Sequence, residues 1–184
     1  RLSSKGRCFF TYANTVATDS HQDISTSHAW MGLRFQLSEN GPVNEISIHV
    51  NLLDRMRLQQ QEVIGILGVN LIYAAIYLTD SEDLFVSALL DNLSTDRAQI
   101  DYINFHGENL KHLSLQRAGL QMLAIKMSDS LIFTPNGELH QSTDHLYGKS
   151  VVVLRGTFAP ITNTNLEILD KAKIAAQDLN NNKK

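Results

Sequence analysis

Two neighbouring stretches of strict alternation constrain the fold of this chain more than any other feature. Each stretch has an apolar residue at every second position: Met31, Leu33, Phe35 and Leu37 in the first, and Ile46, Ile48, Val50 and Leu52 in the second. A period of two is typical of a β-strand that is buried on one face only. Asn40-Gly41-Pro42 lies between the stretches and has the composition of a turn. The two stretches therefore predict an antiparallel pair of strands, and the aromatic-rich segment 7–13 predicts a third.

The next part of the chain predicts helices. Residues 55–78 have the length of a long helix, and Asp54 is a plausible N-cap. Sixteen consecutive residues, 63–78, carry no charge and include Gly65 and Gly68. A membrane-spanning helix needs about 20 apolar residues. We therefore expect this helix to lie at the buried centre of a domain, with the two glycines allowing close packing.

The remaining segments alternate between helix and strand. We expect helices at 81–93 and 109–127, a strand at 99–105, a hairpin around Pro135-Asn136-Gly137, a buried strand at 150–154 and a helix at 165–179. This order predicts an α+β fold, a mostly antiparallel sheet with one face covered by helices, plus a C-terminal strand-turn-helix of α/β type. We expect a core domain at 1–149 and an extension at 150–184.

Composition narrows the classes of partner. The net charge is −3 with a pI of about 6.2, and no polybasic segment is present, so we expect neither nucleic acid nor a membrane as partner. The single cysteine, Cys8, excludes an internal disulfide and a cysteine-based zinc site, and we expect it to be buried. A reduced, cytoplasmic compartment follows as the simplest expectation. Residues 1–7 have no initiator Met and no apolar signal segment, which suggests a fragment or a processed product.

Polar residues on the predicted sheet form a first candidate surface. Trp30, Arg34 and His49 share the side of the strands that the apolar residues leave free, which is either a binding surface or a plain solvated face. Ser47 and His49 lie side by side there, but the sequence identifies no acid to complete a catalytic triad. Asp101 is interpreted as a solvated residue. His140 and His145 are interpreted as part of a surface loop and not as metal ligands, so no metal site is expected.

A second candidate site is the segment 151–166, whose sequence predicts a strand, a Gly-Thr turn and a helix. Backbone N–H groups at such a turn and helix start can bind phosphate. Candidate phosphate contacts are Gly156, Thr157, Phe158, Thr162 and Asn165. The alternative is an ordinary turn in which Thr162 or Thr164 is the N-cap of the helix.

This segment resembles the Gly-x-Phe-x-Pro-x-His-x-x-His start of the nucleotidylyltransferase superfamily, with Thr162 and Asn165 at the two histidine positions. Together with Gly32-Leu33-Arg34-Phe35-Gln36 and Leu89-Leu90-Asp91-Asn92-Leu93, it makes the chain similar to the central part of an uncharacterised bacterial family often labelled nicotinate-nucleotide adenylyltransferase. The resemblance implies ATP with Mg and nicotinate mononucleotide as ligands. Thr and Asn donate hydrogen bonds but carry no positive charge, which argues against transferase chemistry here.

These observations favour a scaffold or interaction domain of a larger cytoplasmic protein, with a vestigial nucleotide-binding turn and no enzymatic activity of its own. One alternative is a nucleotidylyltransferase whose remaining domain lies outside this chain. Another is a small-ligand-binding regulatory domain that uses the free face of the sheet. The expected partner is another protein, the rest of a longer chain or a second copy of this one.

Overall fold

The structure is a computed structural model, and it describes most of the chain. The described residues are 8–17, 27–140, 142–146, 149, 151–156 and 158–181. The chain packs as two units, Arg1–His145 and Leu146–Lys184. The separate roles expected for residues 1–149 and 150–184 stay a prediction.

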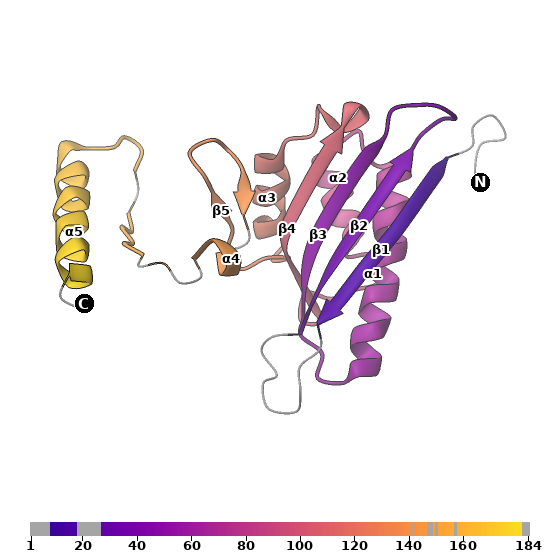
Figure 1. Ribbon diagram of the computed structural model, residues 1–184, viewed down its shortest axis with the longest axis horizontal. Coiled ribbons are helices and arrows are strands. Elements are labelled where there is room, and N and C mark those ends of the chain that lie inside the picture. The colour runs from indigo at the N-terminus through magenta and orange to yellow at the C-terminus, as the bar shows by residue number, and fades with distance from the viewer. Residues whose placement is uncertain are drawn as a thin grey trace. The chain divides into compact units, whose positions relative to one another are not determined.

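The first unit has the expected α+β architecture. Four strands form an antiparallel sheet in the order of the chain: β1 (Phe9–Ala17), β2 (His28–Gln36), β3 (Asn44–Leu52) and β4 (Ala98–Gly107). Three helices lie against one face of this sheet (Figure 1): α1 (Arg57–Tyr77), α2 (Glu82–Leu89) and α3 (Leu115–Ala124). The other face, hereafter the outer face, is the one that carries the candidate site.

The core lies between the sheet and the three helices. The alternation in the sequence predicted most of its sheet half correctly: Met31, Leu33 and Phe35 of β2 and Ile46, Ile48, Val50 and Leu52 of β3 are buried. Leu37 follows the end of β2 and is only partly buried. From the helix side, residues such as Leu67 and Phe85 complete it. Burying each large apolar side chain contributes roughly 1.5–3 kcal/mol to the stability of the folded state.

Helix α1 differs from the expectation of burial on all sides. It rests on a single sheet, so only one side of it is covered, and Val69 and Tyr73 on the other side are 67% and 51% exposed. Gly68 does allow a close approach, because an added Cβ would lie 2.9 Å from the Tyr12 hydroxyl. Gly65 faces open space, with no atom within 4 Å of an added Cβ. Among the described residues no helix is both long and apolar enough to cross a membrane.

Several predicted helix boundaries were wrong, and α2, expected to reach residue 93, ends at Leu89. Asp54 does not cap α1; its Oδ2 instead accepts a hydrogen bond from Arg97 Nε at 2.9 Å. The helix expected at 109–127 is shorter, because a 3-10 turn, η1 (Glu108–Leu110), comes first. Ser114 then starts α3, its Oγ accepting the N–H of Arg117 at 3.3 Å. Serine is common at this position because its hydroxyl oxygen can accept a backbone N–H that has no partner within the first turn of the helix.

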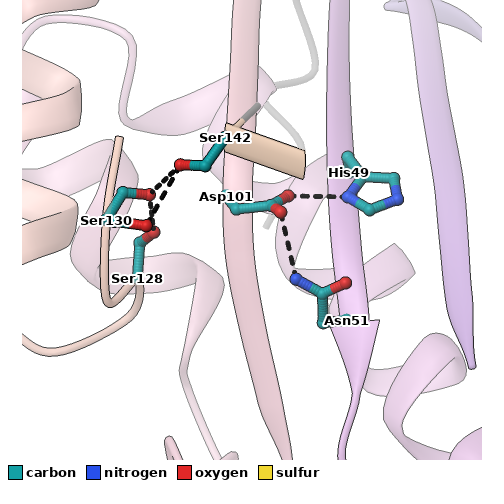
Figure 2. Close-up of polar contacts among 6 residues, drawn as sticks. All are labelled: His49, Asn51, Asp101, Ser128, Ser130 and Ser142. Atoms are coloured by element: carbon teal, nitrogen blue, oxygen red, sulfur yellow. Dashed lines mark hydrogen bonds and ion pairs between the residues drawn. The ribbon is translucent and has the colours of Figure 1, made fainter. Parts of the chain in front are cut away.

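The remaining elements of the first unit are short. The expected hairpin is present as β5 (Ile132–Phe133) and β6 (Leu139–His140), with Gly137 at a φ of 81° in the turn. Helix α4 (Ser142–Leu146) follows. Its first residue is tied to the preceding loop, because Ser142 Oγ donates to the Ser130 carbonyl at 3.1 Å (Figure 2).

In the second unit, the strand expected at 150–154 is wrong. Described residues 151–155 have no strand structure, and Val153 is 81% exposed. A run of β-branched residues becomes a strand only when a neighbouring strand supplies hydrogen bonds and packing, and the described residues supply none here. The helix expected at 165–179 is present as α5 (Asn163–Asn181).

Candidate functional site

The register of the sheet arranges the outer-face side chains in rows that cross all four strands. A charged row contains Thr11, Arg34, Glu45 and His106; a central row contains Ala13, Gly32, Ser47 and Asn104; an aromatic row contains Thr15, Trp30, His49 and Tyr102. Because cross-strand neighbours on one face lie about 5 Å apart, each row brings together residues that are distant in sequence.

A β-bulge in β4 adds one further residue to the aromatic row. The register shifts between His49 and Val50, which leaves Asp101 as the extra residue. As a consequence Ile100 and Ile103, three positions apart, both lie fully buried in the core. A bulge often re-aims a side chain in this way next to a functional site. Here the bulge brings Asp101 to the outer face. In a regular strand Ile100 and Ile103 would point to opposite faces, and only one of them could be buried in the core.

Asp101 connects two residues of the neighbouring strand β3 (Figure 2). Its Oδ1 lies 2.6 Å from His49 Nδ1, and its Oδ2 accepts a hydrogen bond from Asn51 Nδ2 at 3.0 Å. His49 is 1% exposed and Asp101 is 7% exposed. Hydrogen bonds to an ionised group contribute about 1.5–3 kcal/mol each. The carboxylate therefore fixes the orientation of both partners.

Aromatic rings pack around this network. The His49 ring lies 4.8 Å from Trp30 and 5.2 Å from His28, measured between ring centroids. Trp30 also contacts Tyr102 edge to face at 5.2 Å. Trp30 itself remains 38% exposed. The buried network thus holds His49 against an aromatic surface that is still accessible.

A hollow of about 270 Å³ lies on the outer face. The small side chains of the central row leave this space open: Ala13, Gly32 and Ser47 line it. At its rim Arg34 Nη1 forms an ion pair with Glu45 Oε1 at 2.7 Å. A Cβ added to Gly32 would meet no atom within 4 Å. The glycine therefore leaves space on the surface that a side chain would fill.

A larger hollow, of about 560 Å³, lies beyond the end of β4 around η1. Leu110 and Leu113 line it together with the exposed residues Glu108 and Lys111. These two form a salt bridge at 3.4 Å, between side chains that are both largely exposed. An exposed ion pair of this kind contributes little to the stability of the fold. The outer face, with its buried hydrogen-bonded network, is the stronger candidate.

The residues predicted to contact phosphate do not form a comparable site. Gly156 and Phe158 lie in an exposed segment without regular structure, and an added Cβ at Gly156 would lie 3.3 Å from the Phe158 ring. Thr157 lies outside the described residues. Thr162 and Asn165 do come together, because Thr162 Oγ1 accepts the backbone N–H of Asn165 at 3.3 Å. This geometry agrees with the alternative prediction, an ordinary turn in which Thr162 is the N-cap of α5.

Three further expectations concern metals and cysteine. The described part of the chain has no group of three or more His, Cys, Asp or Glu side chains arranged to hold a metal ion. His140 and His145 do lie together, with ring centroids 4.9 Å apart, and His140 Nε2 is 3.3 Å from Glu138 Oε2. Cys8 is half-buried and not fully buried as expected, with its Sγ 3.8 Å from the Leu37 carbonyl.

Two assignments on the outer face were wrong. Asp101 is not solvated, and it is the acid beside His49 that regular alternation does not predict. His49 is buried and not exposed. The spacing of Ile100 and Ile103 was the available signal, because two core residues three apart in a strand indicate a bulge.

Comparisons of this chain with protein-family models, with curated proteins and with solved structures find no match.

Proposed function

We propose that this chain is an interaction domain of a larger cytoplasmic protein and that the outer face of the sheet binds a protein partner. The observation that carries this proposal is the hollow at Gly32, which is lined by the charged row and the central row and has the aromatic row beside it. The buried Asp101 network supports it by holding part of the aromatic row in place. The cytoplasmic compartment is part of this proposal, and the single cysteine, Cys8, supports it because one cysteine cannot form an internal disulfide.

The size of the hollow favours a protein over a small ligand. Small-molecule sites are clefts of about 300–1,000 Å³ that enclose most of the ligand. The hollow at Gly32 measures about 270 Å³ and opens on the face of a sheet. It is too small and too open to enclose a cofactor-sized molecule. It suits one apolar side chain that projects from the surface of a partner.

Residue types that contribute most to protein binding occur in the hollow, at Arg34, and in the aromatic row beside it, at Trp30 and Tyr102. Trp, Tyr and Arg dominate the energetics of protein interfaces. Trp30 and Arg34 are exposed and Tyr102 is half-buried, and all three lie on the outer face. Because Trp30 packs against the buried His49 ring, it loses little conformational freedom when a partner binds.

The same geometry argues against a catalytic role for His49. A general base must come within hydrogen-bonding reach of its substrate. His49 is 1% exposed and packs against both His28 and Trp30. The His49–Asp101 pair is therefore proposed to support the surface and not to transfer protons.

The nucleotidylyltransferase resemblance stays an alternative proposal, with ATP and Mg as its ligands. It depends on residues 156–165, where the Thr162 hydroxyl is already engaged in capping α5. A small ligand on the outer face is the other alternative, and it depends on the same hollow as the leading proposal.

Selection from a random peptide library displayed on phage tests the proposal. We expect the wild-type chain to enrich peptides with an apolar or aromatic anchor. Gly32→Leu places a side chain in the hollow, and its Cβ would meet no atom within 4 Å, so it should weaken their binding by about tenfold or more. Gly65→Leu is the matched control, because Gly65 also faces open space but lies on α1. If no peptide is enriched, or if Gly32→Leu binds the peptides as well as wild type, the proposal is wrong.

A further inference from the structure

Strand β1 forms one edge of the sheet, and its free edge is unusual. It pairs with β2 over nine residues without a register shift, and no described element pairs with its other side. Its sequence, FFTYANTVA, contains no charged residue and no proline. Phe10 is 52% exposed and Val16 is 41% exposed.

The opposite edge of the sheet is different. On β4 a bulge interrupts the strand, and the Ile100 N–H donates to the Met127 carbonyl at 2.9 Å. The Gln99 side chain also donates to Asp129 Oδ2 at 2.9 Å. Proteins protect edge strands with charges, prolines, bulges or covering segments. β4 has two of these devices, whereas β1 has no charge, no proline and no bulge.

We propose that β1 pairs with β1 of a second copy of this chain, antiparallel and about a twofold axis at Ala13. In this register Phe10 lies opposite the partner's Val16, Thr11 opposite the partner's Thr15 and Tyr12 opposite the partner's Asn14. Every pair joins residues on the same face of the two sheets, as antiparallel pairing requires. All nine residues of β1 find a partner.

The composition of β1 makes this pairing self-complementary. A twofold interface brings the same patch of both copies together, so a charge near the axis would meet its own kind. β1 has none. Aromatic residues opposite β-branched residues and threonine opposite threonine are favourable cross-strand pairs, and each occurs twice. Pairing joins the two four-stranded sheets into one eight-stranded sheet. The two outer faces then form one continuous surface, and the dimer presents two copies of the hollow on it.

A charge exchange at Thr11 and Thr15 tests the pairing. Thr11→Glu with Thr15→Glu places like charges opposite each other across the axis, and we expect a dimer dissociation constant at least about tenfold weaker. Thr11→Glu with Thr15→Lys places opposite charges there and should keep the dimer. Within one chain these residues lie opposite Arg34 and Trp30, which accommodate Glu and Lys. Sedimentation equilibrium measures the association, and thermal unfolding confirms that both variants fold.

Cross-linking tests the register separately. In a Cys8→Ser background, Ala13→Cys should form a disulfide-linked dimer under mild oxidation. Ala17→Cys should not, because the two thiols would be about 27 Å apart along the strands. A wild-type chain that stays monomeric at millimolar concentration, an unchanged dimer in the double-Glu variant, or equal cross-linking at both positions would each overturn the proposal.

Discussion

The strand β3 and the segment 151–154 show how the same kind of sequence has two outcomes. Both contain runs of β-branched and apolar residues. In β3, Ile48 and Val50 lie between two neighbouring strands and beneath the helices, and both are fully buried. In the segment, Val153 is 81% exposed and belongs to no strand. The difference teaches that a β-branched run becomes a buried strand only where hydrogen-bonding neighbours exist.

The comparison extends to the two candidate sites. The glycine and threonines of the segment match a known pattern, yet Gly156 lies in an exposed stretch without regular structure. Gly32 matched no catalytic motif, yet it lines a hollow that extends over four paired strands. Side chains on paired strands are fixed in position, and a recognition surface needs such fixed positions.

The largest expected effect contrasts the two apolar runs directly. Ile48→Ala should lower the free energy of unfolding by about 2–5 kcal/mol, because it leaves a cavity in the core. Val153→Ala should change it by less than about 0.5 kcal/mol, as expected for an exposed site. Urea denaturation measures both. A loss above about 2 kcal/mol for Val153→Ala would mean that the segment is packed against other residues.

A somewhat smaller effect is expected for the buried network. Asp101→Ala removes the acceptor for His49 Nδ1 and for Asn51 Nδ2, and it should lower the free energy of unfolding by about 3 kcal/mol. Asp91→Ala removes an exposed carboxylate and serves as the control. Equal effects of the two substitutions would show that the network contributes no rigidity to the outer face.

The N-cap of α5 should have a local effect of about 1 kcal/mol. Thr162→Ala removes the oxygen that accepts the Asn165 N–H, so the first turn of the helix should open more often. Amide hydrogen exchange at Asn165 should become about fivefold faster. Thr162→Ser keeps the oxygen and should exchange like wild type. Unchanged exchange in the alanine variant would remove the evidence that Thr162 is a cap.

The smallest expected effect is that of nucleotide. If residues 156–165 do not bind phosphate, 1 mM ATP with Mg should leave the melting temperature unchanged in wild type and in Gly156→Val alike. A site with a dissociation constant of 10 μM would stabilise wild type by about 2.7 kcal/mol at this concentration. A rise of several degrees in wild type that Gly156→Val abolishes would support the nucleotidylyltransferase alternative.

Much of the fold could be predicted from the sequence because alternation reports directly on burial. It assigned the inner and outer faces of β2 and β3 correctly, including the place of Trp30 and Arg34 on the outer face. The burial of α1 could not be judged, because a charge-free run looks the same whether one side or all sides are covered. The exposure of Val69 shows that only one side is.

The candidate site was predictable only in part. His49 was placed on the correct face, but its acid was missed because Asp101 reaches that face through a bulge that regular alternation does not contain. The hollow was missed for a different reason. It results from small residues on different strands, Ala13, Gly32 and Ser47, which become neighbours only through the register of the sheet.

The most direct test of the central claim is an NMR titration of the isotope-labelled chain with the tightest peptide from the library. We predict that backbone shifts will change most at Gly32 and Ser47, together with the Trp30 indole signal, because these residues line or adjoin the hollow. Residues on the outward side of α1, such as Val69, should remain unchanged. Shift changes confined to α1 or to residues 151–166 would contradict the account.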